Sequence, residues 1–136
     1  MNRDQIKELL PHREPMLLLD EMDIDENEVA YGSYTIRGDE FFLKGHFPNN
    51  PVVPGVIICE IMAQSCSILL GDAIRGKTPY YTGIDKVRFK QKVYPGDKVE
   101  IKAIVTRQKQ MFYFTKCEVT VGGKLAAQGE LSFAIL

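Results

Sequence analysis

His46 stands in a loop whose backbone is stiffened by three nearby prolines, Pro48, Pro51 and Pro54. Nine residues further on, at Gly55, the sequence predicts the start of a helix, where free backbone N–H groups carry a partial positive charge. An imidazole is a suitable base near neutral pH. A base beside such a helix end is arranged to remove a proton next to a carbonyl group and to hold the developing negative charge. We therefore take His46 as a candidate general base; the alternative is a loop histidine that hydrogen-bonds a backbone carbonyl.

Glu60 is the one carboxylate in the apolar run from Val56 to Leu70. Gln64 follows at i+4 and Ser67 at i+7, so a helix places the three polar side chains along one stripe. An apolar setting raises the pKa of a carboxyl group, which would keep Glu60 protonated as a general acid. Two alternatives stay open: Glu60 pairs with one of the lysines, and Gln64 completes the polar stripe without orienting Glu60.

Other kinds of chemistry lack the residues that they need. His46 and Glu60 are too few for a metal site, which takes at least about three protein ligands. His12 lies between Pro11 and Arg13, and we expect a structural role for it. The serines of the apolar run are in a helix interior, which disfavours a nucleophile, and the sequence has no glycine-rich phosphate loop.

The chain of 136 residues has the length of one domain and an ordinary globular composition, with 45% hydrophobic and 26% charged residues. Its net charge of −1 and its scattered basic residues do not favour nucleic-acid binding. The three cysteines form no metal-binding pattern. Because their number is odd and the first residues do not resemble an export signal, we expect a reducing, cytoplasmic location.

Two kinds of segment must position these side chains in the first half of the chain. The run from residue 55 to residue 70 predicts one helix about 24 Å long, apolar on every side and therefore buried on every side. It is too short to cross a bilayer, which takes roughly 20 apolar residues. Residues 4–10 predict a short helix, residues 16–19 a short buried strand or an edge of the core, and residues 29–36 a strand. The acidic residues 23–28 predict a turn.

The second half reads as strands, at residues 80–89, 99–105, 113–121 and 125–135, joined by turns that include residues 94–97 and Gly122-Gly123. Each strand has one apolar face, and the predicted helix is available to cover the sheet. We therefore expect an α+β fold, a single domain over residues 1–136 in which a curved antiparallel sheet wraps around one long helix. Its open edges and spare apolar surface predict a homo-oligomer.

Several motifs in the right order resemble the FabZ-type β-hydroxyacyl-[acyl carrier protein] dehydratases: LPHREPMLLLD, GHFPNNPVVPGVIICEIMAQ, GIDKVRF and YPGD. The resemblance covers nearly the whole chain. It implies the hotdog fold, dimers formed by joining sheets and commonly assembled as trimers of dimers, and removal of water from a (3R)-3-hydroxyacyl thioester in fatty acid elongation. It also implies an acyl carrier protein as partner and no metal or organic cofactor.

By the same resemblance, His46 of one subunit and Glu60 of the other are the catalytic pair, while the Gly55 N–H polarises the thioester carbonyl. Pro54 and Gln64 then support the site. The acyl chain runs into a tunnel beside the helix, which we expect Tyr80, Phe47 and Ile61 to line. Tyr80 is either its gate or simply a strand aromatic.

Basic residues of the first long strand and just beyond it suggest where an acidic carrier protein binds. Lys86, Arg88 and Lys90, with Lys92, recur at every second position, so a strand would point them all the same way. The alternative is a merely solvated strand face. Asn49-Asn50 replaces the glycine-containing pair that many family members have there.

Three other functions remain. The first is a hotdog acyl-CoA thioesterase, which leaves the histidine of the loop unexplained, and the second is a CoA-linked enoyl hydratase. The third is an acyl or carrier-protein binding module without activity. Glutamate at position 60 favours the dehydratase branch over the dehydratase/isomerase branch, which has aspartate there, although isomerisation of the product stays open.

Overall fold

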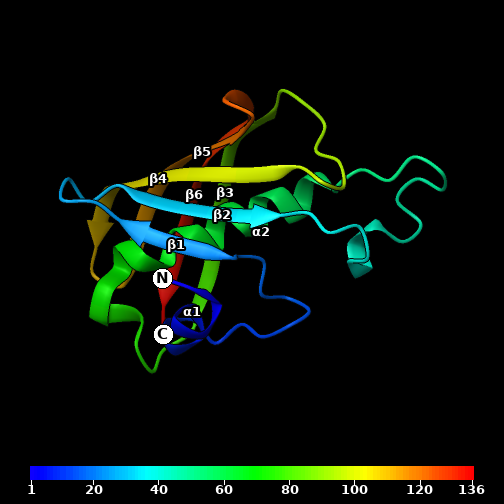
Figure 1. Ribbon diagram of the computed structural model, residues 1–136. Coiled ribbons are helices and arrows are strands. Elements are labelled where there is room, and N and C mark those ends of the chain that lie inside the picture. The colour runs from blue at the N-terminus through cyan, green and yellow to red at the C-terminus, as the bar shows by residue number, and fades with distance from the viewer.

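The sheet of this protein has six antiparallel strands in the order β1-β2-β4-β5-β6-β3 (Figure 1). The computed structural model describes residues 1–136. The strands are β1 (Glu21–Ile24), β2 (Ala30–Thr35), β3 (Pro79–Phe89), β4 (Lys98–Lys109), β5 (Phe112–Val121) and β6 (Lys124–Ile135).

The four strands predicted for the second half are all present, and β4, β5 and β6 follow one another as a meander. The alternation predicted for β5 is confirmed, since Tyr113, Thr115, Cys117 and Val119 are buried while the residues between them are more exposed. The Gly122-Gly123 turn joins β5 to β6 with φ values of 58° and 80°, a left-handed conformation that glycine adopts readily.

Helix α2 (Gly55–Ser65) packs across β2, β4 and β5 and forms the core with them. Its buried side chains include Ile58, Ile61 and Met62. At the closest approach, Gly32 of β2 faces Ser65, and any side chain at position 32 would collide with the serine. A glycine in β2 therefore lets the helix lie directly on the sheet.

The predicted helix over residues 55–70 is shorter than expected, because α2 ends at Ser65 and a 3₁₀ segment, η2 (Ser67–Ile74), follows at a bend of 52°. Side chains explain the bend: the Ser65 hydroxyl donates to the Ile61 carbonyl at 2.9 Å and the Ser67 hydroxyl to the Gln64 carbonyl at 2.7 Å. Such bonds to the preceding turn compete with helical geometry. Neither helix is long and apolar enough by itself to span a membrane; only the bent pair taken together reaches that length.

Of the two alternatives predicted for residues 16–19, the strand is absent and the edge of the core is present. Leu17, Leu18 and Leu19 are all buried, but in an irregular segment before β1. Its backbone groups bond to side chains: Arg3 donates to the carbonyls of Leu17 and Leu19, and Gln64 accepts from the Leu18 N–H. With these partners the segment needs no neighbouring strand. Arg3 is the first residue of α1 (Arg3–Leu9), which begins one residue earlier than predicted. The acidic turn predicted for residues 23–28 begins only after β1 ends at Ile24.

One edge of the sheet and one side of α2 are open to solvent in the single chain. Strand β3 pairs only with β6, and its Tyr80, Ile84 and Phe89 are each more than half exposed. Val56, in the first turn of α2, is 77% exposed, so burial on every side of the helix is not achieved. Such an edge and apolar surface are what a second copy of the chain would cover.

Candidate active site

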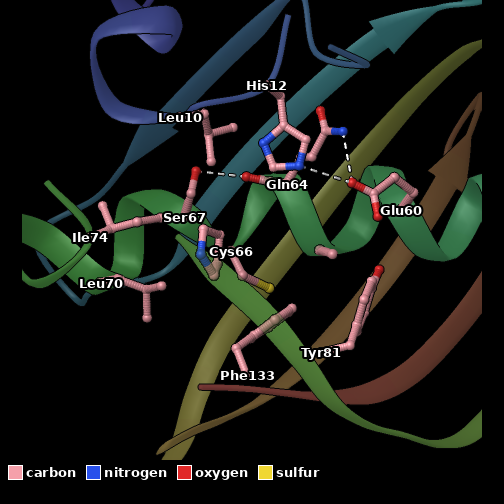
Figure 2. A pocket seen from close by; sticks show the side chains of 12 residues that line it. Leu10, His12, Glu60, Gln64, Cys66, Ser67, Leu70, Ile74, Tyr81 and Phe133 are labelled. Carbon is pink, nitrogen blue, oxygen red and sulfur yellow. Dashed lines mark hydrogen bonds and ion pairs between the residues drawn. The ribbon is translucent and has the colours of Figure 1, made fainter. Parts of the chain in front are cut away.

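A pocket beside α2 contains Glu60 (Figure 2). The whole predicted polar stripe of Glu60, Gln64 and Ser67 lines it, although Ser67 lies beyond the end of α2, in η2. The other lining residues come from the segment around His12, from the end of α2, from η2 and from β3 and β6: Leu10, His12, Ala63, Cys66, Leu70, Ile74, Pro79, Tyr81 and Phe133.

Both polar contacts of the Glu60 carboxyl within the chain are made by the same oxygen, Oε2. The Gln64 side-chain amide donates to it at 2.9 Å, and His12 Nε2 lies 3.3 Å away (Figure 2). Oε1 has no hydrogen bond within 3.5 Å in the chain, although the Tyr81 hydroxyl lies near enough to the carboxyl to help lower its pKa. The carboxyl group is therefore held on one side and available on the other.

Gln64 is 2% exposed and is itself held by the backbone of the irregular segment. Its Oε1 accepts from the Leu18 N–H at 2.8 Å, and its Nε2 donates to the Met16 carbonyl at 2.7 Å. These two bonds fix which way the amide is turned, so that Nε2 faces Glu60 as a donor. Of the two alternatives left by the sequence, the orienting hydrogen bond is the one present.

The expectation of a raised pKa for Glu60 is wrong for the single chain. Burial is the largest single cause and raises the pKa, but the donors His12, Gln64 and Tyr81 together outweigh it, so the pKa lies below its ordinary value of 4.5. The partner is a histidine rather than the lysine considered as an alternative. Across the pocket, burial and then the charge of Glu60 raise the pKa of Tyr81, whose hydroxyl donates to the Cys59 carbonyl at 3.1 Å.

His46 has one anchored ring nitrogen and one without a partner. Its Nδ1 lies 2.8 Å from the Val52 carbonyl, and since a carbonyl only accepts, the hydrogen is on Nδ1. Nε2 makes no hydrogen bond in the chain, and it is the nitrogen that carries the lone pair whenever the ring is neutral. The Val52 N–H in turn donates to the His46 carbonyl at 3.3 Å, and the ring stacks on Phe47 with centroids 4.3 Å apart. The loop thus holds the imidazole through a backbone carbonyl, as the alternative for a loop histidine predicts, and leaves Nε2 without a bond in the chain.

The start of α2 offers unpaired N–H groups, as predicted. Pro54 is the N-cap and supplies no side-chain cap, and the Gly55 N–H makes no hydrogen bond within the chain. A side chain at position 55 would meet the ring of Phe89 at 2.8 Å. Glycine therefore keeps the helix start close to β3 and leaves its N–H groups accessible.

The two candidate catalytic side chains do not meet within one chain. His46 does not line the Glu60 pocket, and the loop that carries it extends beyond the end of the sheet, between the short 3₁₀ turn η1 (Phe41–Leu43) and α2 (Figure 1). Tyr80 and Phe47 are exposed, and Ile61 is in the core, so none of the three expected tunnel residues lines this pocket.

Among the residues of the pocket that the sequence analysis did not place there, two have titratable side chains that face Glu60, His12 and Tyr81. His12 stands in one of the recognised motifs, but its neighbours gave no reason to place it beside α2. Tyr81 follows Tyr80 directly, so in a strand the two side chains point to opposite faces. This alternation was the signal that could have distinguished Tyr81, which lines the pocket, from Tyr80, which does not.

The predicted one-sided row of basic residues is wrong in its geometry. The register of β3 on β6 shifts between Asp85 and Arg88, where Lys86 has a φ of 52°, and the strand ends at Phe89, before Lys90. A bulge of this kind changes the direction of the side chains that follow it. The lysines and the arginine are exposed, and Lys86 lies 3.8 Å from Glu130.

Comparison with known proteins gives a consistent set of relatives. Residues 10–130 match the model of the FabA-like domain family. The chain is 47% identical to the 3-hydroxyacyl-[acyl-carrier-protein] dehydratase FabZ of Clostridium perfringens, over 99% of each chain, and 44% identical to that of Caldicellulosiruptor bescii, over 98% of each. Among solved structures, a chain of the dehydratase heterocomplex ApeI:P from Xenorhabdus doucetiae has the same fold, with a TM-score of 0.81 and 21% identity over 95% of this chain and 89% of that one.

Proposed function

This chain belongs to the FabA-like family and, within it, to the FabZ-type dehydratases, and we propose that it removes water from 3-hydroxyacyl-[acyl carrier protein] with His46 as base and Glu60 as acid. The fold is the hotdog fold that the family resemblance predicted. The observation that carries the proposed roles is the imidazole of His46, anchored at Nδ1 and free at Nε2 in a loop next to the start of α2.

The proposed reaction uses the two groups in one elimination. His46 Nε2 takes a proton from C2 of the thioester, and the Gly55 N–H donates to the thioester oxygen while negative charge develops there. The electron pair of the C2–H bond becomes the C2–C3 double bond, and the C3–O bond breaks. Glu60 gives its proton to the departing hydroxyl, which leaves as water. The proton held by His46 then returns to Glu60 through solvent.

We propose that each site combines His46 of one subunit with Glu60 of another. The two side chains do not share a pocket within the chain, and the apolar surface of β3 and α2 is open beside both. Joining two copies along β3 would cover that surface and place a loop of one copy near the pocket of the other. Assembly of three such dimers, and the tunnel role of Tyr80, Phe47 and Ile61, stay predictions.

The lowered pKa of Glu60 in the single chain is compatible with its proposed role as the acid. Burial is the largest influence on this carboxyl and favours the protonated form. A bound acyl chain excludes more water from the pocket than the free enzyme does, which strengthens the influence of burial. Glu60 then holds the proton that the reaction needs.

Product analysis tests the proposal. The wild type and the Glu60→Gln variant are given 3-hydroxyacyl carrier-protein thioesters of graded chain length, together with plain acyl thioesters. We expect trans-2-enoyl products from the wild type only. Hydrolysis of the plain acyl thioester without dehydration would replace the proposal by a thioesterase, and ligand binding that His46→Ala leaves intact, in a wild type without turnover, would indicate a binding module.

The carrier protein is proposed as the partner on the strength of the relatives' names, and the exposed Lys86 and Arg88 are the first residues to test. Because the carrier is acidic, reversing both charges should weaken binding, and added salt should weaken binding of the wild type. Unchanged binding of the reversed variant would place the carrier elsewhere. The cytoplasmic location also stays a prediction, in keeping with three free cysteines.

A further inference from the structure

His12 is held firmly in place next to the Glu60 pocket by the residues that follow it. Arg13 donates to the carbonyls of Lys7, Leu10 and His12, which ties the segment to the end of α1. Glu14 pairs with Arg3 at 2.8 Å and with Lys7 at 2.9 Å. A segment with so many anchors places the His12 ring in one position, with Nε2 3.3 Å from Glu60 Oε2 (Figure 2).

The ring of His12 is not bonded as a structural histidine usually is. Its Nδ1 is the one buried side-chain nitrogen or oxygen in the chain that has no hydrogen-bond partner. A hydrogen on Nδ1 would be buried without an acceptor, whereas a hydrogen on Nε2 faces a carboxyl oxygen. The neutral ring therefore takes the Nε2–H tautomer. A buried atom left without a partner calls for an explanation other than stability, and a role in the adjacent site provides one.

Two N–H donors, from His12 and Gln64, thus face the same oxygen of Glu60. An oxygen that accepts from two donors cannot also carry the acid proton toward them, so a protonated Glu60 has its hydrogen on Oε1. Oε1 makes no hydrogen bond within 3.5 Å in the chain, and the Tyr81 hydroxyl near the carboxyl donates to the Cys59 carbonyl instead, so Oε1 is the oxygen left for substrate.

We propose that His12 is a positioning residue for the dehydration: with Gln64 it fixes the Glu60 carboxyl so that Oε1 holds the proton and faces the substrate hydroxyl. This inference rests on the proposed function of Glu60. Without the His12 contact the carboxyl turns more freely, and its proton is divided between the two oxygens. The rate of the chemical step then falls, while substrate binding is little affected.

Two amide variants separate this role from a merely structural one. In His12→Gln the side-chain nitrogen reaches close to the place of Nε2, whereas in His12→Asn it reaches only the place of Nδ1. We expect His12→Asn to lower kcat by about 10- to 100-fold with little change in KM, and His12→Gln to restore most of the loss. Glu14→Gln is the control, because it loosens the same segment and leaves the ring contact alone.

A second measurement needs no turnover. The carboxyl of Glu60 is titrated by NMR in glutamate-labelled protein, with Glu60→Gln to identify its signal. The titratable groups that face Glu60 within the chain are His12, Tyr81 of β3 and Cys59 of α2. Because the His12 donor lowers the pKa of Glu60, that pKa should rise in His12→Asn and stay near the wild-type value in His12→Gln.

The outcomes are distinct. If both amide variants keep the wild-type kcat while Glu60→Gln does not, His12 does not position the acid and the proposed function stands. If both lose activity equally and the pKa of Glu60 does not move in either, the role of His12 is structural and the inference is overturned. A wild type without dehydratase activity overturns the proposed function, and the titration alone then decides whether His12 holds Glu60.

Discussion

The loop of His46 and the pocket of Glu60 hold their reactive groups in different ways. The imidazole is fixed by backbone, through the Val52 carbonyl, in an exposed loop that extends from the body of the protein. The carboxyl is fixed by side chains, Gln64 and His12, in a half-buried pocket on a helix packed against the sheet. The base is thus set by the local conformation of a few residues, and the acid by contacts between distant segments.

This difference suits a site shared between two subunits. A protruding loop can reach into a neighbouring molecule without disturbing its own core, whereas a carboxyl that depends on three segments must stay where its partners are. Loss of the base should therefore remove chemistry without loss of stability, and loss of the acid's supports should affect both.

The largest expected effect comes from separating the two groups. His46→Ala and Glu60→Gln should each lower kcat by about 10²- to 10⁴-fold, the usual contribution of a general acid or base. In a mixture of the two variants after subunit exchange, half of the dimers are mixed and each mixed dimer has one intact site, so about a quarter of the wild-type activity returns if the sites are shared. The measurement is the rate of enoyl formation before and after mixing. No recovery, in dimers shown to be mixed, would mean that both groups act within one chain.

Next in size is the removal of the amide that supports the acid. Gln64→Leu leaves the Leu18 N–H and the Met16 carbonyl without their partners, and we expect a loss of about 2–3 kcal/mol in the free energy of unfolding. The corresponding change in the loop of the base, His46→Ala, should alter the free energy of unfolding by about 0.5 kcal/mol or less, because it removes one hydrogen bond in an exposed loop. Urea denaturation of the two variants checks the contrast, and equal losses would show that the two regions are not held differently.

The contrast between local and long-range contacts also separates what the sequence could predict from what it could not. The stripe of Glu60, Gln64 and Ser67 and the alternation of β4 to β6 follow from local periodicity, and both are present. The end of α2 at Ser65 depends on hydroxyl groups that bond to carbonyls of their own helix, and the spacing of apolar residues does not indicate such hydrogen bonds. The irregular segment at residues 16–19 depends on Arg3 and Gln64, whose positions are fixed only by the folded chain.

The candidate site divides in a similar manner. The roles expected of His46 and Glu60 came from residue types in an unusual local setting, and they stay proposals that the geometry supports. His12 was expected to be structural from its neighbours Pro11 and Arg13, and its partner Glu60 is 48 residues away in the sequence. The pKa of Glu60 was predicted from burial alone, and its direction was wrong because that histidine was not counted. Helix and strand patterns carry no information about such distant donors.

A smaller effect is expected from pH on the acid's side of the comparison. The pKa of Glu60 in the folded chain is below the ordinary 4.5, so the ionised form stabilises the fold above that pH, and this stabilisation is lost as pH falls through the folded pKa. Glu60→Gln has no such group. The stability of the wild type relative to this variant should therefore decrease below about pH 4.5, which urea denaturation between about pH 7 and about pH 3 measures. A constant difference over that range would mean that His12 and Gln64 do not stabilise the carboxylate.

The smallest effect belongs to the loop that carries the base. Asn49 has a φ of 65°, a left-handed conformation that asparagine tolerates and glycine adopts without cost. We expect Asn49→Gly to change stability by about 0.5 kcal/mol or less and to leave kcat unchanged, as the family's glycine at this pair suggests.

Asn49→Val places a branched side chain in the same conformation at a cost of about 1–3 kcal/mol, which the loop can avoid by changing its path. Because His46 is bonded to Val52 across that turn, the path change should displace the imidazole and lower kcat, although position 49 is not bonded to the ring. If Asn49→Val keeps full activity, the backbone of the loop does not hold the base, and the contrast with the side-chain support of Glu60 is lost.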